Sequence, residues 1–199
     1  MVWLIIFTSL NLLNLARTLR VRRQESAKAY AEVKRPQGII FALAAFGTLF
    51  FFVESVTYPF IMFSGVFQTG NFPLQLRFQH DSYIQVVGII LETAGYSLFL
   101  WSVLERGRYA VSWEMQEDHQ LVTSGPYRYI RHPSYLAYFL MFLGLFLMLL
   151  NLAALVPLVA IPGYVGIASY EEQMLTKRFG SKYVEYQRRS GRFLPRMKR

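Results

Sequence analysis

The sequence L-V-T-S-G-P-Y-R-Y-I-R-H-P-S-Y occupies residues 121–135 and joins a polar loop to an apolar run. Gly125 and Pro126 predict a turn within it, because glycine and proline favour turn conformations. Pro133 predicts the first turn of a helix, where the missing N–H of proline costs nothing. His132 therefore lies where a loop becomes a helix, and such a helix end offers free N–H donors and a partial positive charge. The stretch indicates a site for a small ligand with an anionic group, and its tyrosine rings are suited to facing a cation.

The composition of the chain is that of an integral membrane protein. Of its 199 residues, 54% are hydrophobic, which is too apolar for a soluble domain of this size. There is no cysteine, which excludes disulfides, thiolate metal sites and cysteine nucleophiles. The formal net charge of +9 is better explained by basic loops beside a membrane than by binding to nucleic acid. The three histidines, at positions 80, 119 and 132, show no metal-ligand spacing, so no metal is predicted.

Five apolar runs predict an all-α fold with five transmembrane helices in a single membrane domain. The first and fourth are short against the ~20 residues that cross a bilayer, so whether they span fully stays open. Asn151 divides the last two runs, which predicts a tight helical hairpin. Residues 170–189 then predict a separate amphipathic helix, weakened in its middle by Gly180. The five runs cover residues 2–16, 39–65, 83–104, 135–150 and 152–169.

The basic residues predict the orientation of these helices. The connector after the first run carries seven of them, the loop after the second one, the loop after the third four and the tail nine. Because basic loops stay in the cytoplasm, the N-terminus is expected outside, and residues 121–135 and the C-terminus inside. The sequence thus predicts a cytoplasmic pocket formed by the loop before the hairpin and the C-terminal helix. Residues 1–82 would supply two spans with a basic connector, and residues 83–199 the functional core.

Four carboxylates stand in or beside the apolar runs. Glu171 and Glu172 follow the last run, and neighbours on a helix project about 100° apart, so at most one is expected to face the interior easily. A solvated helix start, favoured by the helix dipole, explains such a pair without a function. Glu54 and Glu92 lie inside runs, where a carboxylate is a functional hypothesis by default. A hydrogen bond to a polar side chain of the bundle, such as Asn11, is the alternative.

Two stretches carry a resemblance to a known family. One is H-Q-L-V-T-S-G-P-Y-R-Y-I-R-H-P-S-Y at residues 119–135, and the other is E-E-Q-M-L-T-K-R-F-G-S-K-Y-V-E-Y at residues 171–186, followed by F-L-P at residues 193–195. Together they resemble the isoprenylcysteine carboxyl methyltransferase family, within a wider group of membrane methyltransferases that includes phospholipid methyltransferases. The resemblance covers roughly the C-terminal half, and the first two apolar runs carry no motif.

The resemblance implies methyl transfer from S-adenosyl-L-methionine to the carboxylate of a lipophilic acceptor such as a prenylated cysteine. The enzyme would have no Rossmann domain. Ile167 stands where eukaryotic relatives carry an arginine attributed to the substrate, which makes Arg131 the nearest candidate to bind the acceptor carboxylate. The resemblance implies that the cofactor is held by Gln116, His119, Gln120, Leu121, Val122, Tyr127, His132, Pro133, Ser134, Tyr135 and Glu171.

The chemistry of the acceptor decides whether the enzyme needs a base. A carboxylate is already ionised at neutral pH, so positioning and desolvation would suffice, and no catalytic residue is assigned. An amine or a phenol would require a general base, with His119 or Glu171 as the candidates. Two other functions stay open: an NADPH-dependent membrane sterol or enone reductase, which shares a similar R-H-x-x-Y element, and a non-enzymatic membrane scaffold that binds lipid. The natural acceptor and the oligomeric state are not predicted.

Overall fold

The structure is a computed structural model that describes residues 37–64, 73–107 and 120–196, with scattered positions between residues 5 and 16. The described parts are helical and contain no strand, only two isolated β-bridges. This confirms the predicted all-α class. The first apolar run lies largely outside the described residues. The elements are α2 (Ile39–Phe63), α3 (Asp81–Arg106), η2 (Gly125–Arg128), α4 (Pro133–Leu149), η3 (Leu152–Val159), α5 (Ala160–Phe179) and α6 (Ser181–Arg189).

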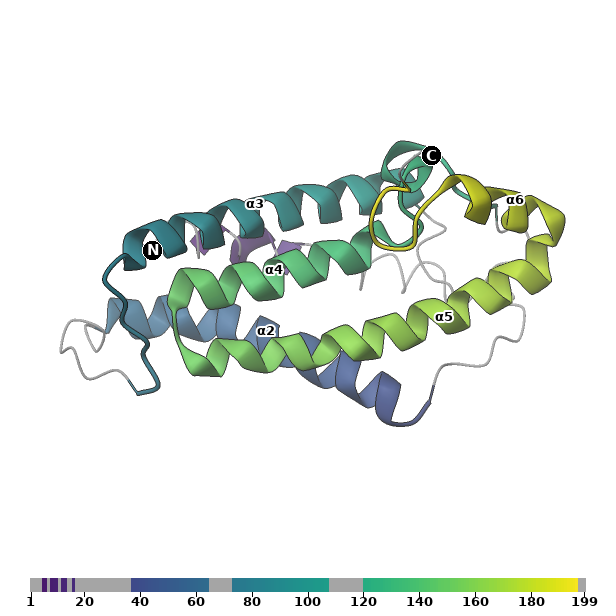
Figure 1. The fold of residues 1–199 in the computed structure, drawn as a ribbon. Helices are drawn as coiled ribbons and strands as arrows, with labels where there is room; N and C mark the ends of the chain where they lie inside the picture. Colours follow the sequence, from purple (N-terminus) through teal and green to yellow (C-terminus); the bar gives the residue numbers. More distant parts are fainter. Residues whose placement is uncertain are drawn as a thin grey trace.

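The long helices form an elongated bundle in which α3 packs against α4, and α2 packs against α5 and η3 (Figure 1). Two glycines allow these close contacts. A Cβ added to Gly144 would lie 2.7 Å from the backbone nitrogen of Glu92, and one added to Gly163 would lie 2.5 Å from that of Ala44. Small residues at helix interfaces are typical of membrane bundles, where close packing of backbones replaces the hydrophobic effect.

Three helices are long and apolar enough to cross a membrane: Ile39–Ile61, Asp81–Arg106, and Leu152–Phe179, which joins η3 to α5. The fourth, α4, has 17 residues and falls short of that length. Large apolar side chains on these helices face outward, among them Phe60 at 77% exposed and Leu49 at 64%. The coarse prediction of a helical membrane protein is thereby confirmed.

The hairpin between α4 and η3 forms as the sequence predicts. Leu150 adopts a left-handed conformation with a φ of 50° and ends α4. Asn151 then caps the next element, because its Oδ1 accepts a 2.9 Å hydrogen bond from the backbone nitrogen of Ala153. The segment that follows is a 3₁₀-helix containing Pro157, whose missing N–H does not permit regular α-helical bonding at that position.

The prediction of a separate helix at residues 170–189 is wrong. α5 continues from the apolar run through Glu171 and ends at Phe179. The change from apolar to polar residues after Ser169 marks a change of environment, but no glycine or proline interrupts the helix there. Gly180, with a φ of 55°, is the true break, and α6 begins directly after it.

Glu54 and Glu92 are buried within the bundle, at 5% and 1% exposed. Both oxygens of Glu54 and Oε2 of Glu92 lack a hydrogen-bond partner among the described residues. Asn11 and Asn14, two of the alternative partners that the sequence suggests, lie outside those residues. The two carboxyl groups thus remain without an assigned role, and neither lines the pocket described below.

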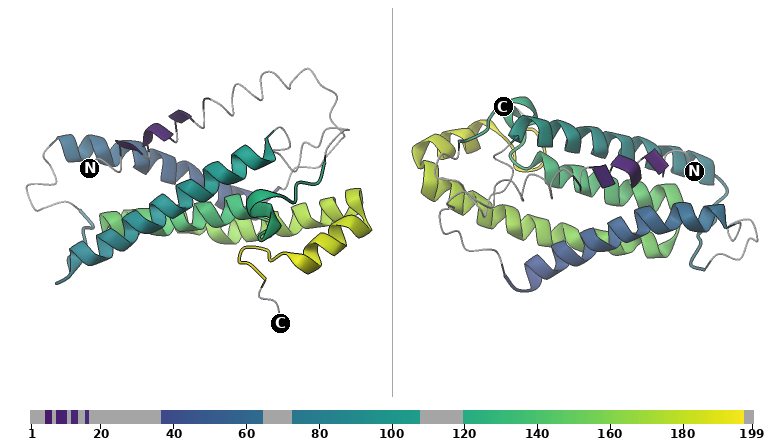
Figure 2. Two further views of the ribbon diagram at one scale, coloured as in Figure 1. Left: turned by 90° about the horizontal axis from the view of Figure 1, so that it is seen from above. Right: turned by 180° about the vertical axis from the view of Figure 1, so that it is seen from behind.

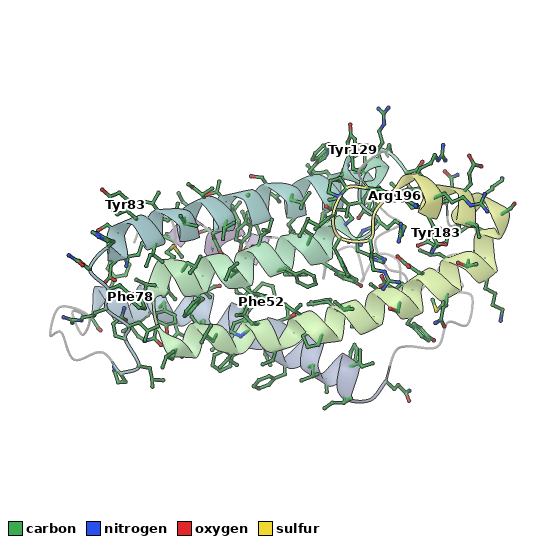
Figure 3. All side chains as sticks on the ribbon, in the orientation of Figure 1. Phe52, Phe78, Tyr83, Tyr129, Tyr183 and Arg196 are labelled. Carbon is green, nitrogen blue, oxygen red and sulfur yellow. The ribbon has the colours of Figure 1, made fainter. Side chains whose placement is uncertain are left out.

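Residues far apart in the sequence meet at one end of the bundle. Figure 2 shows α6 and the C-terminal segment, residues 190–196, gathered there beside η2 and the start of α4. Figure 3 shows the two ends of the bundle. Phe78 and Tyr83 lie at one end, and Tyr129, Tyr183 and Arg196 lie at the other.

Candidate active site

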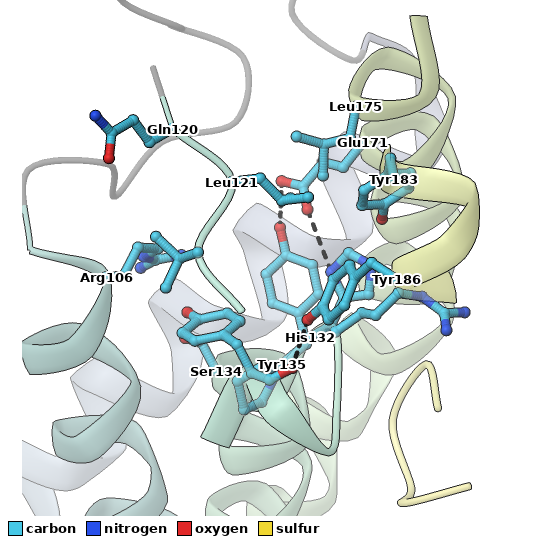
Figure 4. A pocket seen from close by; sticks show the side chains of 14 residues that line it. Arg106, Gln120, Leu121, His132, Ser134, Tyr135, Glu171, Leu175, Tyr183 and Tyr186 are labelled. Atoms are coloured by element: carbon cyan, nitrogen blue, oxygen red, sulfur yellow. Dashed lines mark hydrogen bonds and ion pairs between the residues drawn. The ribbon is translucent and has the colours of Figure 1, made fainter. Parts of the chain in front are cut away.

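A pocket lies at this end of the bundle, bounded by η2, α4, α5 and α6 (Figure 4). Its volume is about 630 Å³ when space open to solvent is counted. The structure brings to its wall ten of the twelve residues predicted for the site. Gln116 and His119 lie outside the described residues. The ten are Gln120, Leu121, Val122, Tyr127, Arg131, His132, Pro133, Ser134, Tyr135 and Glu171.

His132 is the residue at which the loop becomes helix, as predicted, since it immediately precedes Pro133 at the start of α4. Its ring lies between two carboxylates of α5. Nδ1 is 3.4 Å from Oε2 of Glu171, and Nε2 is 3.2 Å from Oε1 of Glu172. Burial lowers the pKa of His132, but the hydrogen bonds to both carboxylates outweigh it and raise the pKa above the ordinary value of 6.5. The site therefore favours the imidazolium, which can donate to both carboxylates.

Tyr135 lies one helical turn further along α4 and holds the other carboxylate oxygen. Its hydroxyl donates a 2.7 Å hydrogen bond to Oε1 of Glu171. Its ring stacks on that of His132, with centroids 5.4 Å apart and planes 4° apart. Glu171 is thus held by His132, which precedes α4, and by Tyr135 of α4, and it still lines the pocket.

Glu172 is the centre of a buried ionic cluster behind the pocket. Arg131 donates from Nε to Oε1 at 2.8 Å, and Arg192 donates from Nη2 to Oε2 at 2.7 Å. Gln187 is a further donor to Oε2 at 3.5 Å. The expectation that only one of the two adjacent carboxylates would face the interior is therefore wrong, since Glu171 and Glu172 are 4% and 6% exposed. The C-terminal segment folds back over the second face of α5 and covers it.

The C-terminal segment is joined to the loop before α4 through the backbone. The amide of Arg131 donates to the carbonyl of Gly191 at 2.9 Å, and the amide of His132 donates to that of Arg192 at 3.0 Å. Phe193 packs its ring near that of His132, with centroids 5.9 Å apart. Arg131 also donates to the carbonyls of Gln187 and Ser190. Its guanidinium lines the pocket but is bonded on the cluster side, and its predicted role toward the acceptor stays a prediction.

Several polar atoms in the pocket wall have no partner among the described residues. They are buried, and buried polar groups in folded proteins are normally hydrogen-bonded. Half of the unpartnered buried side-chain atoms found in the described residues belong to this one pocket. Such a concentration is expected where a polar ligand completes the bonding. These atoms are Nε of Arg106, Oη of Tyr127, Oγ of Ser134 and Oη of Tyr183.

Four lining residues were not predicted from the sequence: Arg106, Leu175, Tyr183 and Tyr186. Leu175 follows Glu171 by four residues, so it shares its helix face once α5 is known to continue. Tyr183 and Tyr186 are three apart on α6 and both are buried, and this spacing was visible in the sequence. Arg106, at the end of α3, carried no signal, because only the fold brings α3 to the pocket.

The chain is similar to known membrane methyltransferases. The phospholipid methyltransferase family model matches residues 83–182. Protein-S-isoprenylcysteine O-methyltransferases are 33% identical over 125 residues in Tribolium castaneum and 32% identical over 109 residues in Saccharomyces cerevisiae. These matches cover 57% and 54% of this chain. They span only 42% of the length of each relative.

A solved structure agrees in fold. It is that of a eukaryotic intramembrane Ras methyltransferase, an isoprenylcysteine carboxyl methyltransferase, with a TM-score of 0.50 and 25% sequence identity. The match covers 77% of this chain and 51% of the other. The family model takes in α3, α4, α5 and the loop that carries His132, which together form most of the pocket wall. The chain therefore belongs to the phospholipid methyltransferase family.

Proposed function

We propose that the protein is an S-adenosylmethionine-dependent methyltransferase of the membrane that methylates the carboxylate of a lipophilic acceptor, such as a prenylated cysteine. The observation that carries this proposal is the set of unpartnered polar atoms in the wall of the pocket that Glu171 also lines. A site with one carboxylate and several free donors suits a ligand with both cationic and anionic groups. The names of the similar proteins supply the reaction class and the acceptor.

The residues present fit S-adenosylmethionine, which supplies an activated methyl group on a sulfonium. Glu171 is placed to accept hydrogen bonds from ribose hydroxyls or from the ammonium group. Ser134 and Tyr127 offer hydroxyls without partners among the described residues. The rings of Tyr127, Tyr135 and Tyr183 line the same wall, and aromatic faces favour a nearby cation. The loop residues Leu121 and Val122 supply apolar surface that would limit the access of water.

The acceptor carboxylate requires a cation, and Arg106 offers one. Its Nε is buried in the pocket wall and unpartnered in the part of the chain that the structure describes. Ile167, at the position of the arginine in eukaryotic relatives, is buried at 2% exposed and is not among the lining residues. We infer that Arg106 holds the acceptor carboxylate, with Arg131 as the alternative predicted from the sequence. A held, desolvated carboxylate is a competent nucleophile without a general base.

The membrane arrangement that we infer keeps five spans in a single membrane domain. Three are the long apolar helices, α4 is the fourth, and the run at residues 2–16 is the fifth. A short helix such as α4 is accommodated by local thinning of the bilayer. With the excess of basic residues inside, the pocket and the C-terminal segment face the cytoplasm and the N-terminus lies outside. A lipophilic acceptor would then enter sideways from the bilayer.

Calorimetric titration of the purified protein in detergent tests the function. S-adenosylhomocysteine and NADPH are each titrated in separate experiments. Binding of S-adenosylhomocysteine without binding of NADPH supports the methyltransferase. Binding of NADPH alone would move the chain to the reductases. A folded protein that binds neither would support the scaffold function. The pocket would then reflect common ancestry with the family and not cofactor binding.

A further inference from the structure

Tyr183 buries a hydroxyl that has nothing to bond within the described residues. The side chain is 1% exposed and is among the largest fully buried ones in the molecule. Its hydroxyl oxygen has no hydrogen-bond partner in the described parts of the chain. An unsatisfied buried hydroxyl costs stability, and phenylalanine would fill the same space without that cost. Packing therefore does not explain why this residue is a tyrosine.

Tyr186, three residues later on α6, is a tyrosine whose hydroxyl is hydrogen-bonded within the protein. Its hydroxyl donates a 2.6 Å hydrogen bond to the backbone carbonyl of Tyr127 and so ties α6 to the turn η2. The two rings are in contact, with centroids 5.8 Å apart and planes at 59°. Both line the pocket. The two tyrosines thus share helix, burial and pocket, and differ in whether the hydroxyl is bonded.

Tyr183 lies on the Glu171 side of the pocket. Figure 4 shows it beside Glu171 and Leu175, with Arg106 and Gln120 across the pocket. After burial, the charge of Glu172 has the largest effect on the pKa of Tyr183, and the charge of Glu171 acts in the same direction with a smaller effect. A ligand bound to Glu171 would therefore lie near Tyr183, whereas a group bound to Arg106 would lie on the opposite side of the pocket.

We propose that the hydroxyl of Tyr183 is a cofactor-binding group, which bonds to a polar atom of the S-adenosylmethionine that Glu171 holds. The inference rests on the proposed function and adds α6 to the elements that bind the cofactor. A phenolic hydroxyl both donates and accepts, so it suits a ribose hydroxyl, an adenine nitrogen or the amino-acid end equally well. Burial raises the pKa of Tyr183 well above its ordinary value, so the group keeps its proton and stays a donor near neutral pH.

The test is the Tyr183→Phe substitution, which removes only the oxygen. The dissociation constant for S-adenosylhomocysteine is measured by calorimetry without any acceptor, together with the thermal midpoint. We expect binding to weaken by roughly tenfold, the equivalent of one hydrogen bond. The midpoint should stay unchanged or rise, because an unsatisfied hydroxyl has been removed.

Two further Tyr→Phe variants serve as controls. Tyr129→Phe removes a hydroxyl from an exposed side chain outside the pocket and should change neither the affinity nor the midpoint. Tyr186→Phe removes a bonded hydroxyl and should lower the midpoint. The fall in affinity without a fall in midpoint is the pattern that only Tyr183→Phe is expected to give.

The outcomes separate the inference from the function on which it rests. If the wild type binds S-adenosylhomocysteine and Tyr183→Phe binds it within twofold, the inference is wrong and the proposed function stands. The same holds if Tyr183→Phe alters only the Michaelis constant for the acceptor. If the folded wild type does not bind S-adenosylhomocysteine at all, the proposed function fails and the inference fails with it.

Discussion

The two carboxylates on either side of His132 are neighbours in the sequence and opposites in their surroundings. Glu172 accepts from Arg131, Arg192 and Gln187, and its oxygens are committed to the protein. Glu171 accepts from Tyr135, contacts His132, and lines a pocket in which four other buried polar atoms are unpartnered among the described residues. The side of Glu172, here called the closed side, fixes where the ring of His132 stands, and the side of Glu171, the open side, faces the pocket. Under the proposed function, positioning and binding are divided between these adjacent residues of one helix.

The largest effect is expected from Glu172→Ala, which removes the centre of the closed side. The largely buried side chain of Arg131, at 11% exposed, would lose its carboxylate, and breaking a buried pair costs about 3–5 kcal/mol. Chemical unfolding in detergent measures the loss. A variant as stable as the wild type would show that the cluster contributes nothing to the fold, and would remove the basis of the comparison.

Glu171→Gln is expected to act on the open side instead. Glutamine keeps the shape and can still accept from Tyr135, so the free energy of unfolding should change less than in Glu172→Ala. Loss of the charge should weaken binding of S-adenosylhomocysteine by roughly 10- to 100-fold, the range for a hydrogen bond to a charged group. Calorimetry measures the affinity. An affinity equal to that of the wild type would assign Glu171 to structure, like its neighbour.

The pH dependence of stability tests whether the ring of His132, between Glu171 and Glu172, carries a charge. Because the folded pKa of His132 is raised above 6.5, its contribution is fully present below pH 6.5 and is lost as the pH rises through the raised value. The thermal midpoint of the wild type should therefore fall on the alkaline side of neutrality. His132→Gln lacks the titrating group and should lose this part of the dependence. Identical pH profiles for the two proteins would contradict a charged ring between the carboxylates.

The smallest effect on the free energy of unfolding is expected from Arg189→Ala. This substitution breaks an exposed ion pair, for comparison with the buried cluster. Nη1 of Arg189 lies 3.8 Å from Oε1 of Glu185, and the two side chains are 67% and 68% exposed. Such surface pairs contribute about 0–1 kcal/mol. The same unfolding measurement should place this variant near the wild type. A loss as large as that of Glu172→Ala would mean that burial does not govern these ion pairs.

Local signals in the sequence were sufficient for the helix boundaries that depend on single residues. Pro133 marks the start of α4, and Asn151 marks the hairpin, because each acts through its own backbone or the residue beside it. The sequence predicts Gly180 only as a weak point within a helix, whereas in the structure it is the C-terminal cap at which α5 ends. The change of polarity after Ser169 was mistaken for a helix boundary, although polarity reports the surroundings of a helix and only the backbone determines where it ends.

The site was predictable to the extent that it lies in the quoted motifs. The residues at 120–122 and 131–135 reach the pocket together because they are nearly continuous in the chain. The role of Glu172 was not predictable, since it depends on Arg192, which approaches only after α6 reverses the chain. Arg106 was missed for a related reason, because α3 contributes to the pocket through packing that no local pattern encodes.

The bridge between Ile130 and Gly191 has a consequence for the order of folding. About sixty residues separate the two bridge partners, so the hairpin of α4 and η3 can form while the loop before it still lacks its partner. During synthesis, the wall that carries His132 stays unfinished until the segment around Arg192 has been made and has folded back. Under the proposed function, a membrane-inserted chain would therefore be unable to bind the cofactor until this segment has folded back.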